Sequence, residues 1–317
     1  MMRPDKNQHG IALMVVLWVL VLLMALATEF AFSMKTEVNT TRNYKEDVES
    51  YHLAKAGINL ALAEIARPAR FHSIHPEHGW ITGKSLPENT EETTPEDFDI
   101  VERNEIPLGS GAITYSITDE NGKIAINSAS REVLVKVLTA SGVGVGTQRD
   151  IIADSILDWI DSDDKHRLNG AESEYYRTQF PPYLAKNSKL ETLEELLRVR
   201  GITQEILFGS TEEETGGYLG LDKFLTTYNV PAINPNTAHE ILLPVLFDEN
   251  QVEQILQARA DKGFFGDNLS SHFRITSTGT INGSPTRHTI VTVVEKFGTA
   301  GNEKLFTHYW NDNYLEQ

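Results

Sequence analysis

Six carboxylates crowd into the stretch DWIDSDDKHRLNGAESEYY, residues 158–176: Asp158, Asp161, Asp163, Asp164, Glu172 and Glu174. Like charges at this density repel one another unless a cation or protons lie among them. Oxygen ligands without sulfur suit Ca²⁺, which takes six to eight oxygens at about 2.3–2.6 Å. The spacing does not fit an EF-hand loop, because no glycine stands at the sharp-turn position after Asp161. The stretch predicts either a calcium site or a solvated acidic loop whose charge His166 and Arg167 partly offset.

Other chemistry is poorly supported by the residue types. Paired carboxylates could act as acid and base, but G-x-S-x-G, H-E-x-x-H and P-loop motifs are absent from the sequence. The chain has no cysteine, which excludes disulfides, thiolate zinc sites and a cysteine nucleophile. The Pro- and Gly-rich stretch 68–97 predicts a linker or surface loop. His72, His75 and His78 recur there every third residue, and such a loop offers no fixed scaffold for a metal. We expect these histidines to be solvated and the protein not to be an enzyme.

The acidic stretch lies in a region of short helices. INSASREVLVKVL (126–138) and INPNTAHEILLPVL (233–246) repeat a pattern, and each precedes a second helix, at 150–160 and 251–260. Residues 190–209 form a third variant. These units resemble the helix-hairpin-helix modules of DNA-binding competence and repair proteins. SGVGVGTQRD (141–150) resembles their glycine hairpin, whose amides can receive a phosphate.

The charge of the region argues against DNA. The formal net charge of the chain is −17, and the hairpin brings only Lys136 and Arg149 close by. Phosphate binding depends on clustered basic residues, whereas this hairpin is followed by six aspartates, from residue 150 to residue 164. We interpret the repeat as a structural unit without a nucleic-acid function.

Strand-like segments lie on both sides of the helical region. Residues 98–106 and 112–119 precede it, and residues 273–283, 285–297 and 304–312 follow it. In the segment 112–119, Ile113, Tyr115 and Ile117 alternate with hydroxyl-bearing residues, which is typical of a half-buried strand. We expect one antiparallel sheet, interrupted by a helical insert.

The N-terminal part predicts one very long helix. Residues 11–27 are all apolar, which is just long enough to span a bilayer. From Thr28 to Arg67 there is no proline, apolar residues recur at helical spacing, and Pro68 supplies the stop. The helix would extend about 85 Å, half of it in lipid. A weakly basic stub before an acidic body favours a cytoplasmic N-terminus. The same residues also allow a cleaved signal peptide, with Ala25-Leu26-Ala27 as its small-x-small cleavage site, or an uncleaved anchor.

The short leader that ends in Gly10, followed by Ile11 and an unbroken helix, resembles the N-terminus of type IV pilins and type II secretion pseudopilins. The resemblance implies that a prepilin peptidase cuts between Gly10 and Ile11 and that Ile11 becomes the N-methylated first residue. Most members carry glutamate as the fifth residue after the cut, whereas this chain has Val15. The subunit that lacks this glutamate is the K-type minor pseudopilin, which starts or caps the filament.

Two further features are similar to the K-type family. That family has an inserted helical domain, and it contains a WxDxD…GAExxYY stretch in which calcium sites have been described. The resemblance implies a structural Ca²⁺ held first by Asp161, Asp163 and Glu172, then by Asp164 and Glu174.

The resemblance covers nearly the whole chain and implies an α+β fold. A long N-terminal pilin-like helix would pack on an antiparallel sheet that carries a large inserted α-helical domain of the helix-hairpin-helix or SAM-like type. The expected segments are a leader (1–10), the transmembrane and amphipathic helix (11–67), the first part of the pilin-like domain (68–125), the insert (126–271) and the completing strands (272–317).

The implied function is that of a minor pseudopilin at the tip of a periplasmic type II secretion pseudopilus, which exports folded proteins. Its implied partners are the I- and J-type minor pseudopilins, the major pseudopilin below it, the inner-membrane secretion machinery, the prepilin peptidase and the lipid around residues 11–27, with no nucleic acid. The chain would cross the inner membrane of a Gram-negative bacterium once, with its C-terminal domain in the periplasm. The alternatives are a membrane-anchored helix-hairpin-helix protein that binds DNA and a minor pilin of a DNA-uptake pilus.

Overall fold

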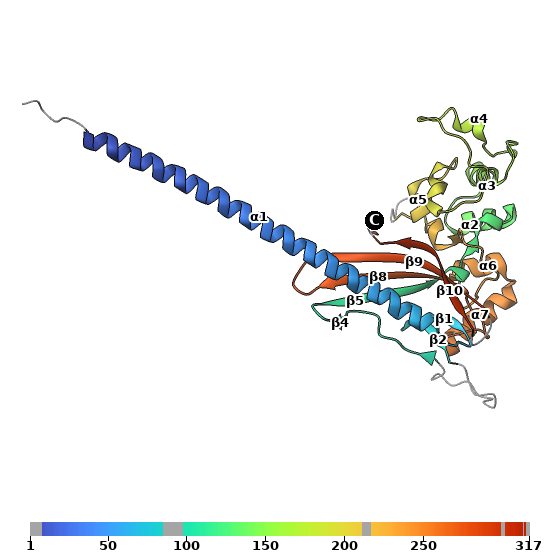
Figure 1. The fold of residues 1–317 in the computed structure, drawn as a ribbon. Coiled ribbons are helices and arrows are strands. Elements are labelled where there is room, and N and C mark those ends of the chain that lie inside the picture. Colours follow the sequence, from blue (N-terminus) through green and yellow to red (C-terminus); the bar gives the residue numbers. More distant parts are fainter. Residues whose placement is uncertain (1–7, 85–97, 211–216, 299–301, 313, 315–317) are drawn as a thin grey trace, which may run out of the picture.

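A computed structural model of the protein describes residues 8–84, 98–210, 217–298, 302–312 and 314. Its first element is the helix α1 (Gln8–Ile65), 58 residues long, which projects far beyond the globular part (Figure 1). The helix ends two residues before the predicted Arg67, since proline at 68 cannot continue it. Among the described residues, one helical segment, Ile11–Ile65, is long and apolar enough to cross a membrane, and its most apolar part contains no buried residue.

The second half of α1 packs on a five-stranded antiparallel sheet, in the order β10-β9-β8-β5-β4. The strands are β4 (Ile106–Leu108), β5 (Gly111–Asp119), β8 (His272–Ile281), β9 (Arg287–Phe297) and β10 (Lys304–Asn311). Ile117 of β5 lies opposite Ile275 of β8, although more than 150 residues separate them. The predicted α+β class, with a long helix on a sheet split by an insert, is therefore confirmed.

Close contact between α1 and the sheet requires glycine at two positions. A Cβ on Gly57 of α1 would lie 2.1 Å from Ser277 Oγ, and one on Gly279 of β8 would lie 2.1 Å from the Ser50 carbonyl oxygen. The absence of these side chains lets helix and strand backbones approach, so that apolar residues of both interlock. The shared core includes Leu53, Ala54, Ile58, Ile65, Ile113, Tyr115, Phe273, Ile275, Ile290 and Val294.

Two predictions for residues 68–106 were wrong. The stretch expected to be a loop contains the strands β1 (His72–His75) and β2 (Gly79–Gly83), and β2 pairs with the short β3 (Phe98–Asp99). The predicted strand 98–106 is broken, because residues 100–105 form no strand between β3 and β4. Backbone pairing is too sparse for a strand there, although the Arg103 carbonyl accepts a hydrogen bond from the Tyr115 N–H of β5 at 2.9 Å.

His72 is buried rather than solvated. Its ring is stacked 5.2 Å from that of Trp80, and its Nδ1 accepts a hydrogen bond from the Ser270 N–H at 3.0 Å. Burial, together with the charge of Lys296, lowers the pKa of His72 to about 3. The neutral imidazole is a structural acceptor that joins β1 to the segment before β8.

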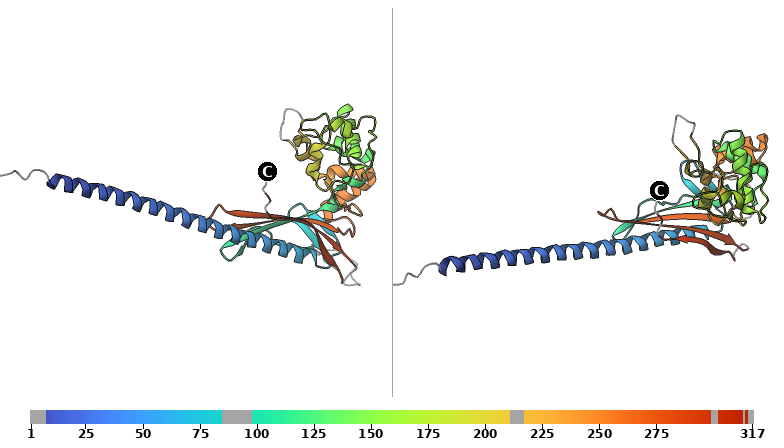
Figure 2. Two further views of the ribbon diagram at one scale, coloured as in Figure 1. Left: turned by 45° about the horizontal axis from the view of Figure 1, so that its top comes forward. Right: turned by 90° about the horizontal axis from the view of Figure 1, so that it is seen from above.

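The insert between β5 and β8 folds around its own core, which includes Leu134, Ile152, Ile156, Trp159, Tyr176 and Phe224. It lies at the end of the sheet remote from the free half of α1 (Figure 2). Its elements are η1 (Glu120–Gly122), β6 (Ile124–Ala125), η2 (Ile126–Ser128), α2 (Arg131–Ala140), α3 (Thr147–Ile160), α4 (Ser173–Tyr176), η3 (Leu193–Arg198), α5 (Gln204–Phe208), η4 (Leu221–Lys223), β7 (Leu225–Thr226), η5 (Glu240–Leu242), α6 (Leu243–Leu246) and α7 (Glu249–Lys262).

The two halves of the sequence repeat do not form equal helices. Ser130 caps the ten-residue α2, whereas the matching part of the second half is the 3₁₀ turn η5 followed by the four-residue α6. Pro244 lies in the first turn of α6, where its missing N–H is tolerated, and it cannot lie inside a longer helix.

Asp119, at the junction of β5 and the insert, joins the two ends of the insert. Its buried Oδ2 accepts hydrogen bonds from the hydroxyls of Thr237 and Ser270, both at 2.5 Å, and Oδ1 accepts one from the Asn121 N–H at 2.8 Å. Burial raises the pKa of Asp119 to about 6, although these hydrogen bonds oppose the rise. The network holds the insert in place on the sheet.

Candidate metal centre

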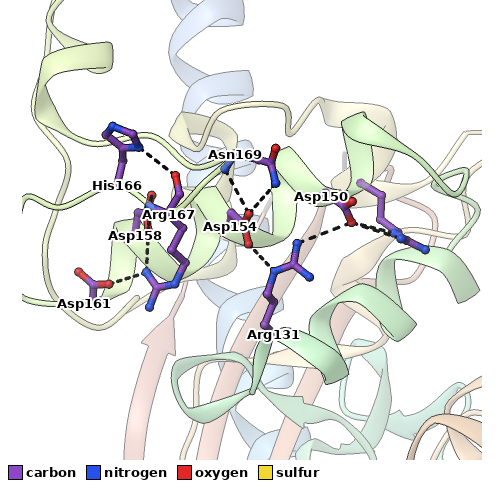
Figure 3. Close-up of polar contacts among 9 residues, drawn as sticks. Arg131, Asp150, Asp154, Asp158, Asp161, His166, Arg167 and Asn169 are labelled. Carbon is purple, nitrogen blue, oxygen red and sulfur yellow. Dashed lines mark hydrogen bonds and ion pairs between the residues drawn. The ribbon is translucent and has the colours of Figure 1, made fainter.

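The acidic stretch begins on α3, which places three aspartates on one face. Asp150, Asp154 and Asp158 follow one another at intervals of four residues, so their side chains lie one above the other. Asp154 and Asp158 are buried, and Figure 3 shows that arginines of neighbouring segments approach this face. A row of partly buried carboxylates therefore requires partners.

Arginines pair with the aspartates of this row (Figure 3). Arg131 of α2 lies 2.5 Å from Asp154 and 3.7 Å from Asp150. Nη1 of Arg167 lies 2.6 Å from Oδ1 of Asp158 and 2.6 Å from Oδ2 of Asp161. Asp161, one of the predicted calcium ligands, thus contributes one oxygen to an ion pair within the protein.

Glu172 differs from these aspartates. The residue is 4% exposed, and neither carboxylate oxygen has a hydrogen-bond partner among the described residues. Burial is the largest cause that raises its pKa from 4.5 to about 7, and the charges of Asp158, Asp161, Asp164 and Asp163 add to the rise. An ionised Glu172 is therefore disfavoured by desolvation and by repulsion, and a bound cation would relieve both.

An open cavity of about 560 Å³ is lined by residues of this stretch, Glu172 among them. Asp164, Glu172 and Glu174 line it together with His166, Arg177 and Arg200. Three of the five predicted ligands therefore lie around one hollow. Asp163 is exposed and accepts the Lys165 N–H at 2.8 Å, while its charge still acts on Glu172.

The donor set fits a hard divalent cation. It offers carboxylate oxygens on a short loop, one of them buried without a partner, and such ligands suit Ca²⁺. Gly170 is part of this fit, because a Cβ there would lie 1.8 Å from Asp158 Oδ2. Sequence reasoning missed Gly170 and Arg200, whose Nη1 donates to the Gly170 carbonyl at 3.2 Å. The only signal in the sequence was the glycine that precedes the Ala-Glu pair.

The glycine hairpin before α3 is not a basic surface. Gly142 has φ +103°, and α3 begins at Thr147. Arg149 pairs with Asp150 at 3.2 Å, and Lys136 pairs with Glu132 at 3.0 Å. The basic groups near the hairpin are thus neutralised by carboxylates, which disfavours DNA binding.

The predicted processing residues lie at the start of α1. The helix begins at Gln8, so Gly10 and Ile11 are both helical, and Ile11 is 66% exposed. Val15 is 56% exposed within the same apolar stretch. The segment 11–27 therefore presents apolar side chains on all sides, as a membrane-anchored helix does.

Comparisons with known proteins agree with this architecture. The family model of type II secretion system (T2SS) protein K matches residues 114–208. The chain is 26% identical over 215 residues to a putative type II secretion system protein K of Escherichia coli K12, a match that covers 64% of this chain and 60% of the relative. It is 25% identical over 267 residues to the protein K of Klebsiella pneumoniae (82% and 78% covered) and 24% identical over 295 residues to that of Pseudomonas aeruginosa (88% and 80% covered).

The fold is also similar to a solved structure, the GspK–GspI–GspJ complex of the type 2 secretion system of enterotoxigenic E. coli. The match has a TM-score of 0.55 and 15% identity, and it covers 89% of this chain and all of the matched chain. The three relatives are all described as type II secretion system protein K, the first of them as putative. In sequence over residues 114–208, and in fold over most of its length, the chain is similar to type II secretion system protein K.

Proposed function

We propose that this protein is a minor pseudopilin that initiates or caps the tip of the pseudopilus through which a type II secretion system exports folded proteins. One observation carries the proposal: the exposed apolar half of α1 continues without a break into the half that packs on the split sheet. Such a helix can lie in lipid before assembly and in the core of a helical fibre afterwards. The role is structural rather than catalytic.

The position of the insert supports a place at the tip. It enlarges the end of the molecule remote from the apolar half of α1 (Figures 1 and 2). A subunit stacked above would meet this bulk. Val15, in place of a carboxylate, also suits a first subunit, because a lone charge in lipid is costly when no neighbouring ammonium is present to pair with it.

The partners follow from this role. The similar solved structure is a complex of GspK with GspI and GspJ. For this chain we propose the corresponding I- and J-type minor pseudopilins as tip partners, the major pseudopilin below, and contacts with the prepilin peptidase and the inner-membrane secretion machinery. The anchor would lie in the inner membrane, with the sheet and insert in the periplasm. We also propose that the acidic cavity holds a structural Ca²⁺.

Maturation should remove ten residues and keep the apolar helix. We expect mass spectrometry of the membrane-bound form to find Ile11 as the first residue, methylated at its nitrogen. Gly10→Leu should abolish the cut, because a large side chain would replace the glycine at which the peptidase acts. The matched control is Ala12→Leu, which should be cut normally. A mature protein that begins at Thr28 would instead establish a cleaved signal peptide.

Tip placement predicts one copy at one end of each fibre. We expect immunogold labelling of intact pseudopili to mark a single end, and co-purification to recover the chain with both minor partners. Val15→Glu should leave seeding intact or impair it only modestly, because a first subunit has no upper ammonium to neutralise. Label spread along the shaft would exclude the tip role. Tight binding of duplex DNA at low salt would favour the rival DNA-binding function.

A further inference from the structure

Three side chains on neighbouring strands of the five-stranded sheet meet at one place, and none of them lines the acidic cavity. They are His272 of β8, Glu295 of β9 and His308 of β10, and their ligand atoms all lie within 4.8 Å of one another. Nε2 of His308 lies 2.8 Å, and Nε2 of His272 lies 3.9 Å, from Oε2 of Glu295. Two imidazoles thus converge on a single carboxylate oxygen.

The sheet register places this cluster on the face opposite α1. Phe273 belongs to the core shared with α1, so the adjacent His272 points to the other face. His272 lies directly opposite Glu295 in the β8–β9 ladder. Side chains of directly opposed residues share a face, so both groups project toward the same side.

A β-bulge brings the third group to the same place. In the β9–β10 ladder Thr307 pairs with Val294 and Tyr309 pairs with Val293, which leaves His308 as the extra residue. Bulges bend a strand and redirect a side chain. Here the extra residue lies beside the carboxylate of the neighbouring strand, where its ring also stacks 5.6 Å from that of His272.

His272 is held in place by a neighbouring polar side chain. Its ring is buried. Its Nδ1 lies 2.9 Å from Ser271 Oγ, while the Ser271 hydroxyl donates to Asn121 Oδ1 at 3.4 Å. The contact of Nδ1 with Ser271 leaves Nε2 as the ring nitrogen that faces Glu295. Such an outer hydrogen bond is what orients histidine ligands in metal sites.

We propose that His272, Glu295 and His308 form a Zn²⁺ site that fastens the edge strand β10 to the sheet. Two imidazole nitrogens and one carboxylate oxygen are a known zinc ligand set, with water as the fourth ligand. Tetrahedral zinc with bonds of about 2.0–2.1 Å separates its ligands by about 3.3 Å. The distances from Glu295 Oε2 to the two imidazole nitrogens, 2.8 Å and 3.9 Å, lie on either side of this ligand separation. His308 lies at the solvent-exposed edge, where its ring can adjust.

The site would have a mechanical consequence. Within the part of the chain that the structure describes, β10 pairs only with β9 and is an edge strand, and it carries exposed Leu305, Phe306 and Trp310. A metal that links His308 directly to β8 would add a covalent-like contact that the ladder with β9 alone does not supply. This zinc site differs from the acidic cavity in its nitrogen ligands, which zinc prefers over calcium.

Calorimetric titration of Zn²⁺ into the full chain tests the proposal. The protein is purified in detergent, treated with chelator and then saturated with Ca²⁺, so that oxygen sites are filled. We expect one zinc equivalent, bound at least about 100-fold more weakly by His308→Gln and by Glu295→Gln. His308 is exposed, so its variant should fold, and unchanged circular dichroism checks this.

His288→Gln is the matched control. His288 also lies on β9 and faces a carboxylate, with Nδ1 3.4 Å from Asp47 Oδ1, and its variant should bind zinc as the parent does. X-ray absorption at the zinc edge should show two imidazole ligands. Any of three results would overturn the site: no zinc binding by the wild type, zinc binding that survives in His308→Gln, or an all-oxygen shell around the zinc. Only a histidine–carboxylate contact would then remain.

Discussion

Arg103→Leu should lower the free energy of unfolding by about 3–5 kcal/mol, the cost of leaving a buried ion pair half empty. The Arg103 and Glu64 side chains are 10% and 4% exposed, and they join through Nη2–Oε1 at 2.5 Å and Nε–Oε2 at 3.2 Å. Tyr115 also donates its hydroxyl to Glu64 Oε2 at 3.2 Å. Without the guanidinium, the carboxylate would remain buried and unpaired at the point where α1 meets β5.

The pKa of Tyr115 also reflects the burial of the Arg103–Glu64 pair. Its own burial, followed by the charge of Glu64, raises the pKa of the phenol to about 12, so it remains a donor. One phenol cannot neutralise a carboxylate, so the charge of Glu64 would be left uncompensated in Arg103→Leu. The double change Glu64→Leu with Arg103→Leu should recover part of the loss, because it removes the unpaired charge as well.

Urea denaturation of the full chain in detergent, followed by the loss of tertiary signal, measures this effect. Arg67→Leu is the matched control, since its ion pair with Asp99 spans 3.7 Å and its side chains are 55% and 43% exposed. An exposed pair of this kind contributes about 0–1 kcal/mol. If Arg103→Leu costs no more than Arg67→Leu, the buried pair does not hold α1 on the sheet.

Calcium at one hundred times its dissociation constant should stabilise the chain by about 2.7 kcal/mol. The increment depends on Glu172, because its buried carboxylate has no other partner among the described residues. Glu172→Gln, or Asp161→Ala combined with Glu172→Ala, should abolish it. The measurement is the melting temperature of the chain in calcium and in chelator. Glu132→Gln, which changes an exposed carboxylate of α2, should retain the full increment.

The pH dependence gives the calcium proposal a second test. The pKa of Glu172 is raised from 4.5 to about 7, so between these values the folded state holds a proton that the unfolded state has released. In chelator, its contribution to stability should therefore fall as pH rises from about 4.5 to about 7. Calcium, which binds the ionised form, should remove this fall, and so should Glu172→Gln. A melting temperature that does not respond to chelator at pH 7.5 would refute the ion site.

Most of the fold could be predicted from local patterns. An uninterrupted helical period and Pro68 determine α1 almost to its last turn. Strict alternation determines β5, and strand-forming residues between turn signals indicate the three C-terminal strands. Local patterns fail where the partner is distant. His72 is polar and stands beside proline and glycine, yet it is buried because Trp80 and Ser270 cover it.

The candidate site was likewise only partly readable. The clustering of carboxylates in residues 158–176 is a property of the sequence, and it indicates a cation site without the fold. The sequence does not show which of these carboxylates lacks a partner, because that depends on where the arginines lie in space. Arg131, on another helix, neutralises Asp154, and Arg167 neutralises Asp158 and Asp161, so that Glu172 is left alone.

The sequence by itself determined the apolar anchor, the helix that continues from it, the strands and the acidic loop, because each depends on residues that are neighbours along the chain. Only the tertiary structure decided the burial of Glu172, the ion pair between Arg103 and Glu64, and the meeting of His272, Glu295 and His308. These depend on sheet register, on one bulge and on the approach of segments separated by tens to hundreds of residues. Electrostatic partners act over a few ångströms in space, so spacing along the chain does not reveal them.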